Sequence, residues 1–289
     1  MIDFIKQHHS IFNLKYFVLQ ALKEDIGDGD HTSLATIHKT KNGKMQLLVK
    51  ENGIIAGVFA AQNIFKLIDK NIKLSMYIHD GEMVMKGDIV FIVEGNIQKL
   101  LTAERLILNI MQRMSGIATK TFFLKNLCKG TKALLLDTRK TTPGFRFFEK
   151  WAVLIGGGIN HRFGLFDKIL IKDNHIDFAG GIIQAIDKVK KYLNENKKKL
   201  DIEIEVRTLD DIKKVITHGG IQRIMLDNFS IIQTKQAVKL INGLYEVESS
   251  GGISEKNINL YARCGVDYIS VGSLTHNIKS LDLSLKAIK

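Results

Sequence analysis

Short apolar runs recur along the second half of the chain, and helical patterns separate them. Runs of four to six apolar residues between helices are typical of parallel strands that are covered on both faces. Six such strands with repeated right-handed crossovers favour a β/α barrel, complete or incomplete, over an open sheet. The predicted strands are 133–137, 168–172, 202–206, 222–227, 245–248 and 268–271, and the predicted helices are about 177–193, 209–218, 231–242 and 254–263.

The first half of the chain has a different pattern, in which short strands and turns stand between amphipathic helices. A helical stripe follows a candidate cap at Asn13, and an acidic, glycine-rich loop is predicted at 24–33. Further segments are predicted as strands at 45–50 and 54–58, a helix at about 60–69, short strands within 72–94 and a long amphipathic helix at about 99–127. We therefore expect a mixed α/β unit of about 100 residues before the barrel.

Composition places the chain among ordinary globular proteins. Of its 289 residues, 45% are hydrophobic and 25% are charged, which is enough apolar material for a sizeable core. The net charge of +12 raises the possibility of a nucleic-acid partner, but many lysines fall in solvated runs such as 194–199, and no nucleic-acid-binding motif accompanies them. We expect no nucleic-acid or membrane partner.

Two cysteines, Cys128 and Cys264, form neither a disulfide framework nor a metal-ligand spacing. Both are expected to be small buried residues in a reducing compartment. The first twelve residues lack the apolar core of a signal peptide, and no run approaches the length of a membrane span. These features predict a cytoplasmic protein.

Polar residues stand at the carboxyl ends of all six predicted strands. In a β/α barrel these ends surround the active site, so their composition tests the fold prediction. The residues concerned are Asp137–Lys140, Lys172–His175, Glu203 with Glu205, Asp227 with Asn228, Glu248–Gly252 and Gly272 with Ser273. Chance would place such residues at one or two ends, so the pattern predicts a single convergent site.

The segment 137–175 concentrates cations among turn-forming residues. Its glycines include Gly156–Gly158, and it contains the only proline of the chain, Pro143. Cations beside tight turns indicate a site that holds a strongly anionic ligand. The cations are Arg139, Lys140, Arg146, His161, Arg162, Lys172 and His175.

Side-chain chemistry suggests how the site divides. Arginine forks suit carboxylates and phosphates, and Arg105 in the long helix is either a further donor or half of a surface ion pair with Glu104. Glu205 and Asp227 face these cations either as internal salt bridges or as groups that bind Mg²⁺ and hydroxyls. The glycines of the last two strand ends, Gly251, Gly252 and Gly272, suit a phosphate monoester.

These groups match a phosphoribosyl pyrophosphate together with an acidic acceptor. Departure of pyrophosphate leaves an oxocarbenium-like ribose, which needs a neutralised leaving group and nearby carboxylates. A rival from another class is a lyase in which Lys172 forms a Schiff base with a phosphorylated carbonyl substrate. A basic nucleic-acid-binding protein is the third class, and salt-sensitive binding to DNA or RNA would reveal it.

Several multi-residue motifs resemble the quinolinate phosphoribosyltransferase family, also called the carboxylating nicotinate-nucleotide pyrophosphorylases. The resemblance covers about residues 18–285. Its motifs are ALKEDIGDGDHTS, TAERLILNIMQRMSGIAT, DTRKTTPGFR, GGGINHRFGLFDKILIKDNH, IEIEVRTL, IMLDN, ESSGGIS and GVDYISVGSLTH. A paralogous group associated with molybdenum transport shares the fold and many glycines, but lacks the full D-T-R-K-T-T-P-G and I-K-D-N-H pattern.

The resemblance implies conversion of quinolinate and phosphoribosyl pyrophosphate to nicotinate mononucleotide, pyrophosphate and CO₂, with Mg²⁺, in de novo NAD biosynthesis. It implies an N-terminal α/β sandwich domain at 1–115, an incomplete, seven-stranded-type β/α barrel at 116–274, and a tail, 275–289, that packs back on the first domain. It also implies a homodimer, with further assembly to a hexamer left open.

Residue roles follow from the same resemblance. Lys140, Lys172, Glu205 and Asp227 are expected to be catalytic, and Glu205 and Asp227 to hold the metal. Arg139, His161, Arg162 and Lys172 are expected around the quinolinate carboxylates, with Arg105 entering from the partner subunit. The remaining substrate-binding residues are Thr138 and Lys140, then Ser250, Gly251, Gly252, Val271, Gly272 and Ser273 for the 5′-phosphate. Arg207 departs from the family pattern, in which an acidic or neutral polar residue follows Glu205-Val206.

Overall fold

The computed structural model describes residues 4, 8 and 11–288. The predicted absence of a signal peptide falls on the first twelve residues, most of which lie outside this range. The chain divides into two compact units, of which the first comprises residues 1–122, 142–157 and 277–289 and the second comprises 123–141 and 158–276. Among the described residues, no helix has both the length and the apolar composition needed to cross a membrane.

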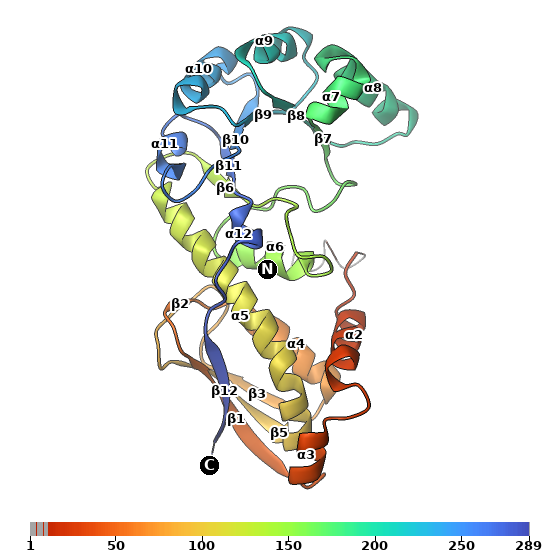
Figure 1. Ribbon diagram of the computed structural model, residues 1–289, viewed down its shortest axis with the longest axis vertical. Coiled ribbons are helices and arrows are strands. Elements are labelled where there is room, and N and C mark those ends of the chain that lie inside the picture. Colours follow the sequence, from red (N-terminus) through yellow and green to blue (C-terminus); the bar gives the residue numbers. More distant parts are fainter. Residues whose placement is uncertain (1–3, 5–7, 9–10, 289) are drawn as a thin grey trace. The chain divides into compact units, whose positions relative to one another are not determined.

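In its described residues, the first unit contains an antiparallel sheet and the helices α2 to α6 (Figure 1). The sheet has the order β12-β1-β5-β3, and a two-stranded ladder, β2 with β4, accompanies it. The strands are β1 (Asn42–Val49), β2 (Gly53–Ile54), β3 (Lys73–Met76), β4 (Met83–Val84), β5 (Ile89–Asn96) and β12 (Leu283–Ile288). The helices are α2 (Leu14–Ile26), α3 (His31–Thr36), α4 (Val58–Ile68), α5 (Ile97–Leu127) and α6 (Arg146–Ile155).

Alternation along the central strands builds the core of this unit. Leu47 and Val49 on β1 and Phe91 on β5 are fully buried, and Phe91 meets Phe65 of α4 edge-to-face at 6.2 Å. Bulky apolar side chains at every second strand position therefore face the helices. The expected strand at 54–58 is wrong, because only Gly53 and Ile54 pair and α4 already begins at Val58.

The end of the chain completes the same sheet. β12 pairs antiparallel with β1, with Leu285 opposite Leu47. Gln112 of α5 fixes the approach to this strand, because its Nε2 donates to the Leu283 carbonyl and its own carbonyl accepts from Leu281. The strand at residues 283–288 thus belongs to the same sheet as β1, which begins at residue 42.

A helix that the sequence pattern did not predict, α6, divides the cation-rich segment 137–175. The turn before it closes through a hydrogen bond from Phe145 N–H to the Thr142 carbonyl, with Gly144 at a positive φ of 75°. Glu149 on α6 is completely buried and accepts a hydrogen bond from Arg113 Nε at 2.7 Å. The segment is therefore not one loop, and Arg146 lies in the first unit.

Six parallel strands form the sheet of the second unit, in the order β6-β11-β10-β9-β8-β7. A parallel bridge between Leu136 and Ile159 extends it beyond β6. The strands are β6 (Leu134–Leu136), β7 (Ile169–Ile171), β8 (Ile202–Val206), β9 (Arg223–Asp227), β10 (Glu246–Ser250) and β11 (Tyr268–Ser270). This is the incomplete barrel that the sequence predicted.

Helices lie along the outside of this sheet (Figure 1). They are α7 (Asp173–Ala179), α8 (Ile182–Glu195), α9 (Leu209–His218), α10 (Ile231–Ile241) and α11 (Ile258–Ala262). A short helix, α12 (Ser273–His276), follows β11. Capping boxes at Thr208 and Ser230 start α9 and α10 directly after β8 and β9. Both α9 and α10 therefore begin beside the end of the preceding strand, where candidate site residues lie.

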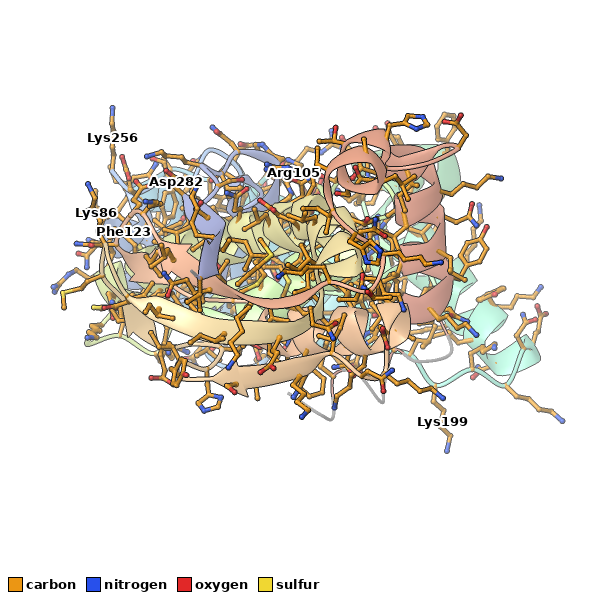
Figure 2. The ribbon with its side chains drawn as sticks, turned by 90° about the horizontal axis from the view of Figure 1, so that it is seen from below. Lys86, Arg105, Phe123, Lys199, Lys256 and Asp282 are labelled. Carbon is orange, nitrogen blue, oxygen red and sulfur yellow. The ribbon has the colours of Figure 1, made fainter. Side chains whose placement is uncertain are left out.

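Lysines account for much of the excess positive charge, and many of them are solvent-exposed. Figure 2 shows Lys86, Lys199 and Lys256 projecting away from the ribbon, and all three are exposed. Lys86 belongs to the first unit and the other two belong to the second. These lysines are scattered and solvated, whereas a nucleic-acid-binding surface gathers its lysines and arginines in a continuous patch.

Candidate functional site

The residues expected at the site, apart from Arg105, all belong to the second unit. Adjacent strands there are in register, so that Asp227 lies opposite Ser250 and Glu205 lies opposite Met225. Because successive side chains on a strand alternate between faces, Glu203 and Glu205 share one face of β8. The outward positions of β8 are Ile202, Ile204 and Val206, all buried.

Lys172 and Glu205 form an ion pair at the ends of neighbouring strands. Lys172 Nζ lies 3.6 Å from Glu205 Oε2, and the lysine side chain is 48% exposed whereas that of Glu205 is 9% exposed. Lys172 also starts α7, where its backbone N–H donates to His175 Nδ1 at 2.9 Å. The helix start fixes the backbone of Lys172 and leaves its ammonium group within reach of a ligand.

The carboxyl of Glu205 has a raised pKa. Burial is the main cause, the charge of Lys172 acts in the opposite direction, and Asp227 raises the pKa further. Two carboxylates near one cation hold an excess of negative charge at the strand ends. This excess suits a divalent cation or a ligand with developing positive charge. We name Lys172, Glu205 and Asp227 the strand-end cluster.

Asn228 joins β9 to the glycine loop after β10. Its backbone N–H donates to the Ser250 carbonyl at 2.9 Å, and its Nδ2 donates to Asp227 at 2.8 Å. A side chain at position 251 would collide with the Asn228 amide, and Gly251 also has a φ of +90°. Only glycine therefore permits this close approach of loop and strand end.

Lys140 lies against the glycine at the end of β11. A Cβ at position 272 would stand 3.0 Å from Cδ of Lys140 and 3.2 Å from the ring of His276. The Lys140 carbonyl accepts from Thr275 Oγ1 at 2.8 Å, and its N–H donates to Thr138 Oγ1 at 3.0 Å. Gly272 thus leaves room for the lysine stem.

Part of the backbone next to Gly272 is hydrogen-bonded within the protein. Val271 N–H donates to the Leu136 carbonyl at 3.0 Å, so this amide belongs to the sheet. Ser273 begins α12. Of the predicted phosphate-binding residues, Ser250, Gly251 and Gly252 stand at the end of β10.

Arg139 and Arg162 are two neighbouring cations. Burial is the main cause of the lowered pKa of Arg162, repulsion from Arg139 lowers it further, and the charges of Glu203 and Asp167 offset these effects only in part. Arg139 Nε is buried and has no hydrogen-bond partner among the described residues. Two guanidinium groups with an unmatched buried donor are a suitable receptor for carboxylates.

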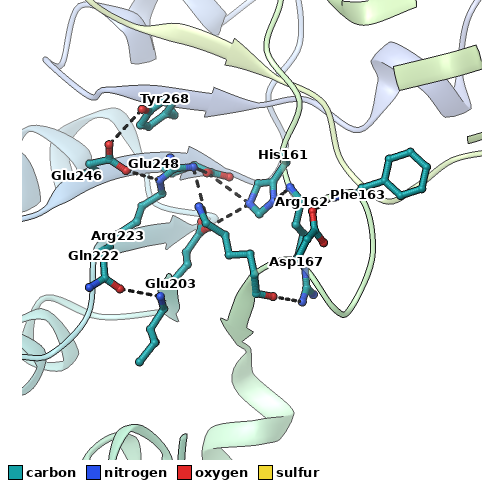
Figure 3. Close-up of polar contacts among 12 residues, drawn as sticks. His161, Arg162, Phe163, Asp167, Glu203, Gln222, Arg223, Glu246, Glu248 and Tyr268 are labelled. Carbon is teal, nitrogen blue, oxygen red and sulfur yellow. Dashed lines mark hydrogen bonds and ion pairs between the residues drawn. The ribbon is translucent and has the colours of Figure 1, made fainter. Parts of the chain in front are cut away.

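His161 lies next to Arg162 in sequence and is almost completely buried, with 8% of its surface exposed. Its backbone N–H donates to Asp137 at 2.7 Å, and its Nδ1 accepts from the Arg162 N–H at 2.7 Å. Its Nε2 lies 3.1 Å from Glu203 and 3.6 Å from Glu248 (Figure 3). Both ring nitrogens therefore face the protein.

Charged residues deep on the same sheet face surround this histidine. Arg223 Nη1 lies 3.0 Å from Glu248 (Figure 3). Lys168 Nζ lies 3.4 Å from Glu203. We name this group the buried charge cluster; it comprises His161, Lys168, Glu203, Arg223 and Glu248. At its rim, Arg223 also contacts Glu246 at 2.9 Å and stacks over the Tyr268 ring at 3.8 Å.

The two buried carboxyls differ sharply in pKa. Burial acts to raise the pKa of Glu203, but contacts with His161, Lys168 and Arg223 outweigh burial and hold this pKa at about 2. Burial, followed by the charge of Glu203, raises the pKa of Glu248 to about 7. Glu203 is therefore the persistent anion of the cluster, and Glu248 is the group that binds a proton most readily.

Two places in this unit offer carboxylate ligands to a metal. His161, Glu203 and Glu248 have ligand atoms within 4.8 Å of one another, but Arg223 and Lys168 already balance these carboxylates. The strand-end cluster, in contrast, has two carboxylates and one lysine, and Lys172 is about half exposed. Mg²⁺ prefers carboxylate and phosphate oxygens, so the strand-end cluster fits it better.

Arg105 and Arg207 lie outside these clusters at exposed positions. Arg105 lies on α5 in the first unit, where its charge opposes the burial that raises the pKa of Glu104. Arg207 Nη2 lies 3.3 Å from Asp177 of α7, and both side chains are about half exposed or more. Arg207 is thus paired with α7, at a surface ion pair.

Sequence reasoning missed part of this arrangement. Arg223, Glu246 and Lys168 were not candidates, and neither was His276. A signal was present, because Arg223 begins β9 and Glu246 and Glu248 take alternate positions of β10, on the face that Glu203 occupies. Pairing the strands in register would have brought these charges together.

Two family models match the chain, one for each part. The model for the N-terminal domain of quinolinate phosphoribosyl transferase matches residues 30–115, and the model for the C-terminal domain matches residues 117–286.

Relatives of known name match over nearly the whole chain. The mitochondrial quinolinate phosphoribosyltransferase [decarboxylating] 2b of Nicotiana tabacum is 44% identical, over 96% of this chain and 83% of the relative. The probable nicotinate-nucleotide pyrophosphorylase [carboxylating] of Bacillus subtilis is 39% identical, over 94% of this chain and 92% of its own length.

Solved structures agree with these matches. NadC from Streptococcus pyogenes has a TM-score of 0.89 and 36% identity, covering 99% of this chain and 98% of that one. The nicotinate-nucleotide pyrophosphorylase from Francisella tularensis has a TM-score of 0.88 and 40% identity, covering 95% of this chain and 96% of that one. Taken with the site at the strand ends, these matches show that the chain belongs to the quinolinate phosphoribosyltransferase family.

Proposed function

We propose that the protein transfers the phosphoribosyl group of phosphoribosyl pyrophosphate to quinolinate and releases CO₂. The products are nicotinate mononucleotide, pyrophosphate and CO₂, which places the enzyme in NAD biosynthesis. The observation that carries the proposal is the similarity to enzymes of this name over almost the full chain. The Schiff-base lyase and the molybdenum-associated paralogue find no support among these relatives.

The dicarboxylate is proposed to bind at Arg139, Arg162 and Lys172. Support comes from the buried Nε of Arg139, which has no hydrogen-bond partner among the described residues, and from the repulsion between the two arginines, which Glu203 and Asp167 offset only in part at Arg162. Each guanidinium fork can bind one carboxylate by two hydrogen bonds. A substrate with two neighbouring carboxylates therefore suits this pair better than a monocarboxylate does.

Phosphoribosyl pyrophosphate is proposed to bind across the strand ends. Lys140, beside Gly272, would contact its phosphates, and the loop of Ser250, Gly251 and Gly252 would hold the 5′-phosphate. Mg²⁺ held by Glu205 and Asp227 would neutralise the pyrophosphate leaving group. Burial is the main cause of the raised pKa of Glu205, and the charge of Asp227 raises it further, so the two carboxylates lie close enough to act on one another.

The reaction then follows from positioning and charge. The pyridine nitrogen forms a bond to the ribose carbon as the bond from that carbon to pyrophosphate breaks. The ring becomes cationic, so it can accept the electron pair of the bond to its 2-carboxylate, which leaves as CO₂ and is replaced by a proton. Glu205 and Asp227 are proposed to stabilise the cationic ribose through their negative charge.

The test is a mixture of the protein with Mg²⁺, quinolinate and phosphoribosyl pyrophosphate. We expect nicotinate mononucleotide and CO₂ in equal amounts, with release of CO₂ dependent on phosphoribosyl pyrophosphate. Nicotinate is the control acceptor, and we expect it to react poorly because it lacks the second carboxylate. Equal use of nicotinate, or borohydride trapping of Lys172 with a carbonyl substrate, would contradict the proposal.

A homodimer with Arg105 supplied by the partner subunit forms part of this proposal, as does a cytoplasmic location. Mixing two inactive variants, Arg105→Ala and Lys172→Ala, tests the shared site. If each site uses Arg105 of one subunit and Lys172 of the other, mixed dimers contain one intact site and activity returns. Light scattering on the same samples distinguishes a dimer from a hexamer. No recovery after proven subunit exchange would argue that both residues act within one chain.

A further inference from the structure

Arg162 is held at two places, its backbone and its guanidinium group. Its backbone N–H donates to His161 Nδ1 at 2.7 Å, and its Nη1 donates to the Lys168 carbonyl at 3.2 Å. The loop between these neighbours is closed by Asp167, which accepts from the N–H groups of Phe163 and Gly164 at 2.6 and 2.9 Å. The arginine thus depends on two flanking residues for its position.

His161 and Lys168 both contact the same atom, Oε2 of Glu203. Glu203 Oε2 lies 3.1 Å from His161 Nε2 (Figure 3). The same oxygen lies 3.4 Å from Lys168 Nζ. Glu203 is fully buried on β8, so neither contact is shared with solvent. His161, Arg162, Lys168 and Glu203 therefore form a closed ring of contacts, in which a single carboxylate oxygen anchors both supports of the arginine.

The protonation of the His161 ring follows from this ring of contacts. Nδ1 accepts a hydrogen bond from a backbone N–H, so it carries no proton. The ring proton is then on Nε2, which faces Glu203 and Glu248. Since both nitrogens are used within the protein, the ring is suited to orient Arg162 and not to contact a ligand by itself.

We propose that Glu203 is a positioning residue for dicarboxylate binding, and that it acts on Arg162 through His161 and Lys168. This inference rests on the proposed function for the identity of the dicarboxylate, which is quinolinate. Glu203 contacts both neighbours of Arg162 through one buried oxygen, because its Oε2 lies 3.1 Å from His161 Nε2 and 3.4 Å from Lys168 Nζ.

The first test is the variant Glu203→Gln, which keeps the size of the side chain and removes its charge. We expect the KM for quinolinate to rise by roughly 10- to 100-fold, as for other residues that orient a ligand-binding group. The KM for phosphoribosyl pyrophosphate is expected to stay unchanged. A merely structural role would change both constants or neither.

The matched control is Glu246→Gln. Glu246 contacts the same Arg223, at 2.9 Å, on the same sheet face, but no contact joins it to His161 or Lys168 in the described part of the chain. Both KM values are expected to remain those of the unmodified protein. An equal rise of the quinolinate KM in both variants would overturn the proposal, because it would show a general effect of lost charge.

A double-mutant cycle separates action through Arg162 from independent effects. In an Arg162→Ala background, Glu203→Gln is expected to cause no further rise in the quinolinate KM. Additive effects would overturn the proposal. Where Glu203→Gln fails to fold, Lys168→Met removes the contact between Lys168 Nζ and Glu203 and keeps the carbonyl that Arg162 contacts, and a smaller rise confined to the quinolinate KM is expected. Unchanged quinolinate binding in Lys168→Met would then overturn it.

A crystal structure of Glu203→Gln gives a result that does not depend on turnover. We expect the Arg162 guanidinium to leave the Lys168 carbonyl, which it contacts at 3.2 Å in the unmodified protein. An unmoved guanidinium would overturn the positioning role. Absence of quinolinate turnover in the unmodified protein would instead contradict the proposed function, so the two failures can be distinguished.

Discussion

The two charge clusters on the inner face of the six-stranded sheet both contain carboxylates and a lysine, but they differ in how far cations balance the carboxylates. In the buried charge cluster, Glu203 and Glu248 are fully buried, and His161, Lys168 and Arg223 surround them within 4.0 Å. In the strand-end cluster, Glu205 and Asp227 have one lysine, at 3.6 Å from Glu205.

The difference indicates what each cluster does. Buried charges must be paired within the protein, because water cannot solvate them, and removal of one partner is costly. Charges at the strand ends are partly exposed and can remain unbalanced until a ligand arrives. The deep cluster should therefore control folding and the position of Arg162, and the strand-end cluster should control turnover.

The largest effect on stability is expected from Arg223→Ala in the buried charge cluster. Loss of the guanidinium leaves Glu203 and Glu248 without a main counter-charge, and the free energy of unfolding should fall by about 3–5 kcal/mol. Urea unfolding followed by circular dichroism measures this change. The control is Arg263→Ala, an exposed arginine that donates to Asn259 on its own helix. A loss below about 1 kcal/mol, typical of a surface pair, would show that the deep cluster is not structural.

Lys172→Ala tests the strand-end cluster. We expect kcat to fall by about 10²- to 10³-fold, as for the loss of one charge-stabilising donor, with the free energy of unfolding nearly unchanged. Steady-state kinetics and urea unfolding on the same preparation measure both quantities. The matched control is Lys132→Ala, because Lys132 is exposed in the same unit and also pairs with a carboxylate, Asp267. A folded Lys172→Ala protein with normal turnover would remove the strand-end assignment.

Glu248 gives the buried charge cluster a dependence on pH. The pKa of this carboxyl is about 7 in the folded protein, because burial and the charge of Glu203 raise it, against 4.5 as its ordinary value. Between these values the folded chain binds a proton that the unfolded chain does not, so stability falls as pH rises from about 4.5 to about 7. Glu203, with a pKa lowered to about 2, loses its contribution only below the ordinary value and so outside this window.

Glu248→Gln should remove that slope. Urea unfolding at about pH 5 and about pH 7 is expected to give a smaller difference in the variant than in the unmodified protein. Glu246→Gln should keep the slope, since Glu246 lies at the rim and its side chain is 47% exposed. A slope that persists in Glu248→Gln would assign the titration to another group.

The smallest effect on stability and activity is expected from Arg207→Ala, because Arg207 belongs to neither cluster. Its partner Asp177 is on the surface of α7, and such pairs contribute about 0–1 kcal/mol. Activity should not change, although the family pattern has an acidic or neutral residue at this position. A clear change in the KM for either substrate would show that α7 transmits the loss of this pair to Lys172 at its start.

Local pattern was sufficient to predict the second sheet. The strand predicted at 202–206 is the observed β8, and the helix predicted at 209–218 is the observed α9. Alternation on the strands and capping residues on the helices are both local, so they can be read directly from the sequence. The strand ends, and hence Lys172, Glu205 and Asp227, follow from these elements.

Other features depend on contacts that sequence does not display. The expected loop at 24–33 contains the end of α2 and the start of α3, which Asp30 caps by accepting from Ser33 N–H at 3.1 Å. α6 was missed because its residues are interleaved with cations, and its Glu149 is buried only because Arg113, distant in sequence, reaches it. The buried charge cluster likewise needs strand register, which joins Glu203 to Arg223 across twenty positions.

The pairing of β12 with β1 has a consequence for the synthesis of the chain. β1 begins at residue 42 and its partner begins at residue 283, so the ribosome must make the entire second unit before β1 can acquire this neighbour. Until then, one edge of the first sheet has unpaired backbone groups beside apolar side chains such as Leu47, a combination that promotes association between chains. The nascent protein is therefore most vulnerable to aggregation while its catalytic unit is being completed.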